Sequence, residues 1–230
     1  MFDWTAHTKD PSDTAVAVKL QAFLTGLQVF FATTRNDFLR EYFRGAHVLD
    51  IGAGEHNPSC YNEEKWEHGI ICKVAAYAVG IEINAELCEH YNQKGYRFKC
   101  IDATSEIDLG ERFDRVFMGD VIEHVNNPVA LLQFAKRHLV AGGRILLTTP
   151  NPYYFAGIGT RSRKKNRPFF IANFEHTCWI TPTNANELAR RSGLQFTRIY
   201  FPQGSLKKRL LEALGLIENA HKEFMYEFTA

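Results

Sequence analysis

Short apolar segments alternate with amphipathic segments from Ala46 to Thr149, and this alternation limits the fold more than any other feature of the chain. The strand-like segments are Ala46–Ile51, Ala78–Ile83, Tyr96–Ile101, Phe113–Gly119 and Arg144–Thr149. Helices are expected between them, over Glu63–Tyr77, from Asn84 to near Gly95, and from Asn127-Pro128 to Val140. Strands and helices that alternate in this way form a parallel sheet with helices on both faces. The sequence therefore predicts an α/β fold.

Segments on both sides extend this pattern. Residues 13–32 place apolar side chains at helical spacing, and a second short helix ends at Gly45, so we expect residues 1–45 to form an N-terminal helical cap before a domain of residues 46–230. Residues 151–180 lack periodicity, which is typical of a lid or insertion. A helix beginning at Thr181-Pro182, an amphipathic helix at Leu206–Leu216, and strands at Gln195–Phe201 and Glu223–Thr229 complete the expected elements.

Composition and charge exclude several classes of protein. The 230 residues are 45% hydrophobic and 23% charged with a net charge of +1, which argues against disorder and against a membrane-embedded chain. The N-terminus lacks the pattern of a signal peptide, so we expect a cytoplasmic protein. No C-x-x-C pair occurs, so we expect neither a zinc site nor a redox motif, and the functional site is predicted to hold no metal. The cysteines are expected to be thiols in a reducing compartment. These cysteines are Cys60, Cys72, Cys88, Cys100 and Cys178.

Three of the predicted strands end in residues suited to a nucleoside ligand, and the carboxyl ends of parallel strands are where such sheets bind ligands. Asp50-Ile-Gly-Ala-Gly54 provides glycines that let the backbone approach a ligand closely. Glu82 can accept hydrogen bonds from both hydroxyls of a ribose, and Asp102-Ala103 follows the third strand beside the expected adenine. A nucleoside-bearing cofactor is therefore the first hypothesis.

The glycine pattern argues against a dinucleotide. The G-x-G-x-x-G fingerprint that begins at Gly52 would place its third glycine at Asn57. In addition, Asp50, two positions before Gly52, suits a cationic ligand better than a pyrophosphate. S-adenosylmethionine carries such a cation, since its amino-acid portion has an ammonium group and its sulfur is a sulfonium.

Five motifs in order resemble one known family. They are VLDIGAG (48–54), GIEIN (80–84), IDAT (101–104), FDRVFMGDVIEHVNNP (113–128) and GGRILLTTPNP (142–152), with a weaker match at 176–194. Together they resemble class I S-adenosylmethionine-dependent methyltransferases, in particular the small-molecule subgroup with ubiquinone-biosynthesis-type enzymes. The resemblance implies a Rossmann-like doubly wound sheet of seven strands in the order 3-2-1-4-5-7-6, with the seventh strand antiparallel.

The resemblance also implies roles for particular residues. Asp50, Gly52 and Gly54 would hold the methionine end of the cofactor, and Gly119 and Asp120 would line its amino-acid portion. The adenosine end would contact Glu82 through the ribose, and Ile83, Asp102 and Ala103 through the adenine.

The chain departs from the family's pattern at two places in its first loop. His56 stands where the family usually has a third glycine, and the stretch from Asp50 to Glu82 is longer than usual. The surplus is assigned to Glu55–Asn62, a segment that would lengthen this loop.

A hydroxyl acceptor must lose a proton when it is methylated, and histidine is suited to take it near neutral pH. His124, at the edge of the expected cofactor cleft, and His176, in the irregular segment, are the catalytic candidates, with His56 and His68 as further choices. Each candidate can instead have a structural role, fixing a loop by hydrogen bonds.

The nature of the acceptor stays open between several classes. A phenol or quinone-like compound, a lipid-linked precursor and a sugar are all compatible with the leading hypothesis, O-methylation of a small molecule. Nucleic acid is disfavoured, because the Pro150–Tyr153 stretch resembles an amino-methyltransferase motif but follows the wrong strand. The basic run Arg161–Arg167 can contact an anionic surface or be a solvated loop. A binding protein of this fold without catalysis is a third hypothesis, and oligomeric state is not predicted.

Overall fold

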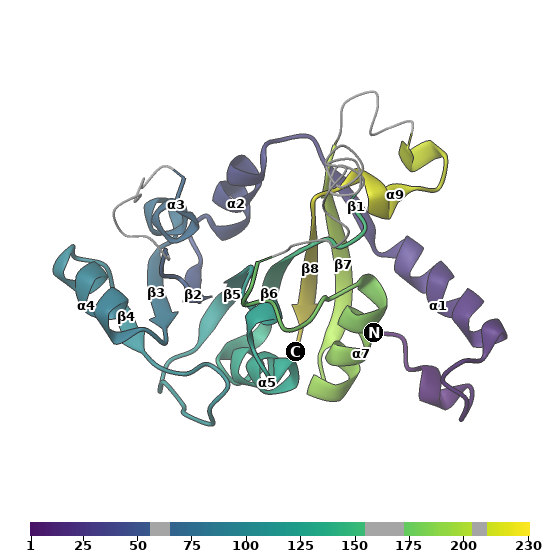
Figure 1. Cartoon of the computed structure of the whole chain (residues 1–230). Helices are drawn as coiled ribbons and strands as arrows, with labels where there is room; N and C mark the ends of the chain where they lie inside the picture. Colours follow the sequence, from purple (N-terminus) through teal and green to yellow (C-terminus); the bar gives the residue numbers. More distant parts are fainter. Residues whose placement is uncertain (56–64, 155–172, 204–210) are drawn as a thin grey trace.

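The computed structural model describes residues 1–55, 65–154, 173–203 and 211–230. Its centre is an eight-stranded sheet in the order β1-β7-β8-β6-β5-β2-β3-β4 (Figure 1). The strands are β1 (Gln28–Phe31), β2 (His47–Ile51), β3 (Tyr77–Glu82), β4 (Phe98–Cys100), β5 (Phe113–Gly119), β6 (Leu139–Pro150), β7 (Gln195–Pro202) and β8 (Glu223–Thr229). Only β8 runs antiparallel to its neighbours, β6 and β7.

The expected sheet order is confirmed for seven of these strands. Without β1, the strands read β4-β3-β2-β5-β6-β8-β7, which is the order 3-2-1-4-5-7-6 with an antiparallel seventh strand. The eighth strand differs from the expectation. Residues 28–31 do not continue the N-terminal helix but pair in parallel with β7. Their sequence, Gln-Val-Phe-Phe, is rich in residues that favour strands, and the open edge of β7 supplies partners for their backbone.

Helices cover both faces of the sheet (Figure 1). Side chains of α1 (Thr14–Gly26), α5 (Pro128–Arg137) and α7 (Pro182–Ser192) belong to one apolar cluster. Side chains of α2 (Arg35–Phe43) and α3 (Glu67–Val74) belong to the cluster on the opposite face. A third cluster joins α4 (Ala85–Gln93) to β4 and Trp66. The short helices are η1 (Trp4–Ala6), η3 (Ile122–His124) and α9 (Ile217–Ala220).

Three of the expected helix starts are confirmed by side-chain caps, whereas the helix expected from Glu63 begins at Glu67 without one. The Asn84 side chain accepts hydrogen bonds from the first backbone N–H groups of α4, and Asn127 does the same for α5, with Pro128 in the first turn. Thr181 and Asn184 form a capping box at α7, which ends at the left-handed Gly193. Two helix ends are wrong. Tyr77 begins β3 rather than ending a helix, because its backbone pairs with His47. The helix expected to reach Val140 ends at Arg137, because β6 begins at Leu139 and pairs with Phe113.

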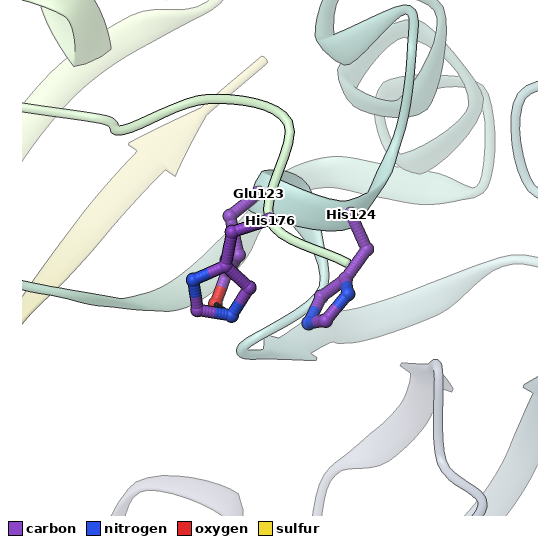
Figure 2. Close-up of side chains that lie close together, drawn as sticks. All are labelled: Glu123, His124 and His176. Carbon is purple, nitrogen blue, oxygen red and sulfur yellow. Dashed lines mark ion pairs between the residues drawn. The ribbon is translucent and has the colours of Figure 1, made fainter. Parts of the chain in front are cut away.

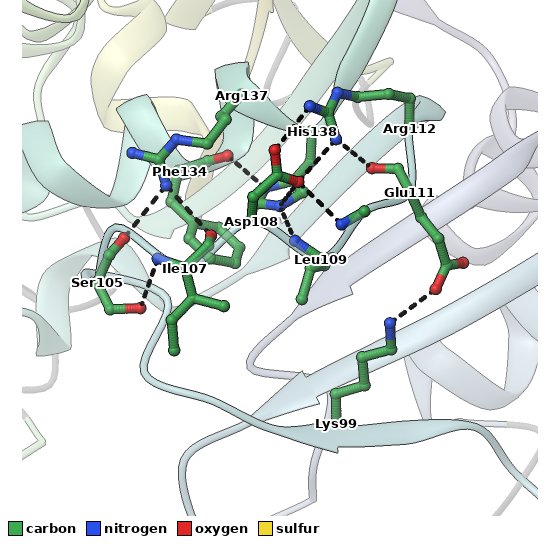
Figure 3. Close-up of polar contacts among 11 residues, drawn as sticks. Lys99, Ser105, Ile107, Asp108, Leu109, Glu111, Arg112, Phe134, Arg137 and His138 are labelled. Carbon is green, nitrogen blue, oxygen red and sulfur yellow. Dashed lines mark hydrogen bonds and ion pairs between the residues drawn. The ribbon is translucent and has the colours of Figure 1, made fainter.

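The connection between β4 and β5 is held to the end of α5 by hydrogen bonds (Figure 3). His138 donates from Nδ1 to the Phe134 carbonyl oxygen at 2.8 Å and accepts at Nε2 from the Leu109 N–H at 3.0 Å. Arg112 bonds Asp108 through two nitrogens at 2.8 and 2.9 Å. The bond from Leu109, together with the bonds from Arg137 to the Ser105 and Ile107 carbonyl oxygens at 3.4 and 3.3 Å, holds this connection against the end of α5.

No helix in the described parts of the chain combines the length and the apolar character needed to cross a membrane.

Candidate active site

A cavity of about 730 Å³ lies at the carboxyl ends of β2, β3 and β5. The structure brings all the predicted cofactor and catalytic residues to its wall. They are Asp50, Gly52, Gly54, Glu82, Ile83, Asp102, Ala103, Gly119, Asp120, His124 and His176. Convergence of this kind is the direct consequence of a parallel sheet, whose strands all end at one edge.

The loop after β2 packs so closely that it requires glycine at two positions. Gly52 has φ +72°, and a Cβ there would lie 2.3 Å from a methyl group of Val121. A Cβ on Gly54 would lie 2.7 Å from Oε2 of Glu82. Glycine at both positions lets the loop pass directly over the ends of β3 and β5.

Glu82 ends β3 with its carboxylate held by the backbone. Its Oε1 accepts from the N–H groups of Ile83 at 2.9 Å and Asn84 at 3.0 Å, and its Oε2 accepts from Gly54 at 3.3 Å. The Ile83 side chain beside it is 69% exposed, although it borders the cavity. A fixed carboxylate next to an exposed apolar side chain suits a ribose with a flat base stacked beside it.

Asp50, at the end of β2, is buried against a histidine. Its Oδ2 lies 2.9 Å from Nδ1 of His68, and both side chains are excluded from solvent. Burial alone would lower the pKa of His68, but the bond to Asp50 outweighs it and raises that pKa to about 9. Burial also raises the pKa of Asp50, although the bond to His68 opposes that shift. His68, one of the further catalytic candidates from the sequence, contacts Asp50 beside the first loop, whereas His124 and His176 lie at the far end of the cavity.

Arg35 and Glu67 are two of the charged residues of the cavity wall that sequence analysis missed, and Glu123, described below, is another. Arg35, in the first turn of α2, forms ion pairs with Glu67 at 2.6 Å and with Glu223. Burial raises the pKa of Glu67 to about 7, although Arg35 opposes the shift. The three residues come from α2, α3 and β8, so no local pattern in the sequence could have revealed that they meet.

Asp120, directly after β5, has a backbone conformation that is unusual for a residue other than glycine, with φ 51°. Buried Thr148 supports it, since the Asp120 N–H donates to Thr148 Oγ1 at 3.2 Å and this hydroxyl donates to Asp120 Oδ1 at 3.2 Å. Strain at such positions is common in functional sites.

The two catalytic candidates lie next to each other and to a buried carboxylate. Figure 2 shows Glu123 and His124 on η3 and His176 on the segment beside it, with all three side chains pointing the same way. The two imidazole rings are 4.8 Å apart between centroids. Nε2 of His176 lies 3.9 Å from Oε1 of Glu123, and burial raises the pKa of Glu123 to about 7. These residues offer one ligand atom each within 4.8 Å of one another, which is the arrangement of a candidate metal site.

The segment with His176 is fastened to η3 by Thr177. The Thr177 N–H and hydroxyl donate to the Glu123 carbonyl oxygen at 2.8 and 3.1 Å. Asn173, Glu175 and His176 belong to the predicted lid and border the cavity. Several other predictions fall outside the described residues: His56 and the rest of the long first loop, the basic run Arg161–Arg167, and the first part of the Leu206–Leu216 helix.

Comparison with known proteins agrees with this geometry. A family model described as a methyltransferase domain matches residues 23–199. The chain is 26% identical over 167 residues to a protein of Dinoroseobacter shibae named ubiquinone biosynthesis O-methyltransferase, a match that covers 66% of this chain and 61% of the relative. It is 25% identical over 193 residues to phosphoethanolamine N-methyltransferase 2 of Caenorhabditis elegans, covering 80% of this chain and 40% of the relative. The chain thus spans about three fifths or less of these curated relatives.

Solved structures share the fold at low sequence identity. An S-adenosylmethionine-dependent methyltransferase from Mesorhizobium loti has a TM-score of 0.55 at 15% identity, covering 84% of this chain and 96% of that one. A TehB-like methyltransferase from Corynebacterium glutamicum has a TM-score of 0.53 at 16% identity, covering 96% and 99%. The family model, the sheet order and the glycine loop over Glu82 agree, and the chain belongs to the methyltransferase-domain family of class I enzymes, whose cofactor is S-adenosylmethionine.

Proposed function

We propose that this protein transfers a methyl group from S-adenosylmethionine to a hydroxyl group of a small molecule. One observation carries the proposal: a single cavity connects the loops of β2 and β3 with the Glu123–His124–His176 cluster. The names of the Dinoroseobacter shibae relative and of similar bacterial proteins support an oxygen acceptor. The Caenorhabditis elegans relative, which matches more of this chain, makes an amine the second candidate.

The residues of the cavity fit the cofactor from end to end. In our proposal Glu82 binds the ribose hydroxyls, and Ile83, Asp102 and Ala103 line the adenine. The methionine end lies beside Asp50, Gly52 and Gly54, and beside Gly119 and Asp120 on the other strand. The bare glycines support this fit, because a Cβ on Gly52 would collide with Val121 and one on Gly54 with the carboxylate of Glu82. When bound, S-adenosylmethionine supplies a methyl group activated by its positively charged sulfur.

The chain's own contribution is to align the acceptor and to accept its proton. Alignment of two reactants can supply about 7–11 kcal/mol of barrier reduction. His124 and His176 border the same cavity as the cofactor loops, and they are our candidates for the residues that take the hydroxyl proton. A well-placed base contributes roughly 10²–10⁴-fold to such a reaction.

Calorimetric titration with S-adenosylmethionine and S-adenosylhomocysteine tests the cofactor part. We expect micromolar binding to the wild type and at least roughly tenfold weaker binding to Glu82→Gln, since hydrogen bonds to charged groups contribute about 1.5–3 kcal/mol. Glu86→Gln is the matched control, because Glu86 is an exposed residue of the neighbouring helix. Equal affinity of the two variants would contradict the proposed site.

An acceptor panel tests the rest of the proposal. It contains phenols, vicinal diols, a phosphorylated amine and an RNA oligonucleotide, and methylated product is identified by mass spectrometry. Methylation of a hydroxyl compound supports the proposal, and methylation of the amine or RNA alone replaces it. Tight cofactor binding with no product on any acceptor would favour the binding protein considered above.

A further inference from the structure

The Glu123–His124–His176 cluster has the chemistry and geometry of a metal site, and we propose that it binds a divalent transition-metal ion, with Zn²⁺ as the reference ion. Two imidazoles and one carboxylate are a ligand set found in catalytic zinc sites with an open position. Imidazole ligands favour transition metals over Mg²⁺, which prefers oxygen ligands.

The first argument is an unsatisfied buried carboxylate oxygen. The Glu123 side chain is 0% exposed, and its Oε1 has no hydrogen-bond partner among the described residues. Its other oxygen accepts from Thr149 Oγ1 at 3.1 Å, so the carboxylate is fixed with Oε1 facing the histidines. A buried polar atom without a partner costs about 1–3 kcal/mol, and an ion bound to Oε1 would remove that cost.

The second argument is the spacing of the ligand atoms. Two atoms each about 2.1 Å from a zinc ion lie roughly 3.4 Å apart in a tetrahedral site. Glu123 Oε1 and His176 Nε2 are 3.9 Å apart, which is too long for a hydrogen bond but close to this spacing. His124 lies within 4.8 Å of both, so small side-chain rotations bring all three atoms to one ion.

The third argument is the support around the ligands. Nδ1 of His124 lies 3.7 Å from the Glu175 carboxylate, and its other ring nitrogen is on the side of His176 (Figure 2). Metal-binding histidines commonly face a carboxylate through the ring nitrogen that does not bind the metal. The bonds from Thr177 to the Glu123 carbonyl oxygen hold the two segments of the site together before any ion binds.

The role of the ion rests on the proposed function, whereas its binding does not. A hydroxyl coordinated at the open position would have a lowered pKa. Its oxygen would then form the bond to the methyl carbon as the carbon–sulfur bond breaks and its electron pair stays on sulfur. The hydroxyl proton would pass to a solvent water. With the ion bound the imidazoles would be ligands, and the ion would replace His124 and His176 in the role that the proposed function gives them, activation of the hydroxyl.

Titration of the chelator-treated protein with ZnCl₂ tests the site without any acceptor. We expect one Zn²⁺ per chain in the wild type and no measurable binding in His176→Ala. His47→Ala is the matched control and should bind as the wild type does, because His47 begins β2 at the opposite edge of the sheet. Glu175→Gln should bind roughly tenfold more weakly with the same ligands. Co²⁺ is the second probe, since its visible absorption reports nitrogen and oxygen ligation directly.

S-adenosylhomocysteine affinity, measured on each variant, shows whether the fold is intact. The proposal is overturned if the wild type binds neither Zn²⁺ nor Co²⁺. It is also overturned if His176→Ala binds Zn²⁺ as tightly as the wild type and still binds S-adenosylhomocysteine. Methylation at the same rate with and without chelator would overturn the role of the ion and leave the proposed function standing. Zn²⁺ binding that His176→Ala abolishes, without methylation of any acceptor, would support the site and contradict the proposed function.

Discussion

At the scale of single residues, the site depends on positions where only one residue type fits. Gly52 combines a left-handed backbone with a closed space, whereas Gly110 has a similar φ of +73° and nothing within 4 Å of an added Cβ. A comparison of the two positions therefore separates the effect of backbone strain from that of steric exclusion. Asp50 and Glu82 are comparable cases, since each carboxylate is held in one orientation by named partners.

We predict that Gly52→Ala lowers the free energy of unfolding more than Gly110→Ala does. Left-handed backbone costs an alanine about 1–2 kcal/mol at both positions. At Gly52 the new methyl group also overlaps Val121, and overpacking adds about 1–3 kcal/mol. Denaturant unfolding measures both values. S-adenosylhomocysteine titration should show weaker binding for Gly52→Ala alone, and equal losses in the two variants would contradict the close packing of this loop.

The Asp50–His68 pair predicts a pH dependence of stability. Because the pKa of His68 is raised from 6.5 to about 9 in the folded chain, its stabilisation is complete below pH 6.5 and is lost as the pH rises through about 9. The loss has a slope of at most about 1.4 kcal/mol per pH unit for one proton. Denaturant unfolding between pH 6.5 and 9 should show this slope in the wild type and lose it in His68→Asn. A slope that is unchanged in the variant would assign the effect to another group.

At the scale of elements, the fold was predictable where a local pattern had one meaning. The caps at Asn84, Asn127 and Thr181 mark helix starts through hydrogen bonds made within a few residues, and all three are confirmed. Residues 28–31 were assigned wrongly, since their apolar side chains continue the helical spacing of residues 13–26. Only the free edge of β7, formed by residues far along the chain, makes this segment a strand.

The link between α5 and the segment from Ser105 to Arg112 gives a prediction at this scale. His138→Phe keeps an aromatic ring beside Phe134 but removes the acceptor of the Leu109 N–H. We expect a loss of about 1–3 kcal/mol in the free energy of unfolding and faster amide exchange at Leu109. His47→Phe, at an exposed position, controls for the change of ring. Unaltered exchange at Leu109 would show that this bond does not hold the segment.

The same bond also responds to pH. Burial lowers the pKa of His138 below its ordinary value, and Nε2 can accept from Leu109 only while it lacks a proton. The stabilisation from this group is therefore complete above pH 6.5 and declines as the pH falls from there toward the lowered pKa. Unfolding measured over that range should show a decline in the wild type that is smaller in His138→Phe. This window lies below that of His68, so the two effects are separable.

At the scale of the whole molecule, the position of the site was predictable and much of its electrostatics was not. Parallel strands place their carboxyl ends together, so Asp50, Glu82 and Asp102 could be assigned to one edge of the sheet from the sequence alone. The Arg35–Glu67–Glu223 contact joins three elements that no periodicity relates. His124 and His176 were each selected singly, but their contact with buried Glu123 depends on how residues 173–179 lie against η3.

Because the cavity is assembled from segments across the chain, a bound cofactor should stabilise the fold as a whole. At a concentration 100 times its dissociation constant, a ligand adds about 2.7 kcal/mol to the free energy of unfolding. For a chain of this size each kcal/mol raises the melting temperature by about 2–4 °C, so S-adenosylhomocysteine should raise it by roughly 5–11 °C. At the same ligand concentration, Glu86→Gln should retain the shift, whereas tenfold weaker binding to Glu82→Gln should remove about half of it. NADH should produce none, because Asn57 replaces the third glycine of the dinucleotide pattern. A shift with NADH as large as that with S-adenosylhomocysteine would mean that the cavity recognises adenosine alone. The amino-acid portion of the cofactor, which Asp50 and Asp120 are proposed to border, would then add nothing to binding.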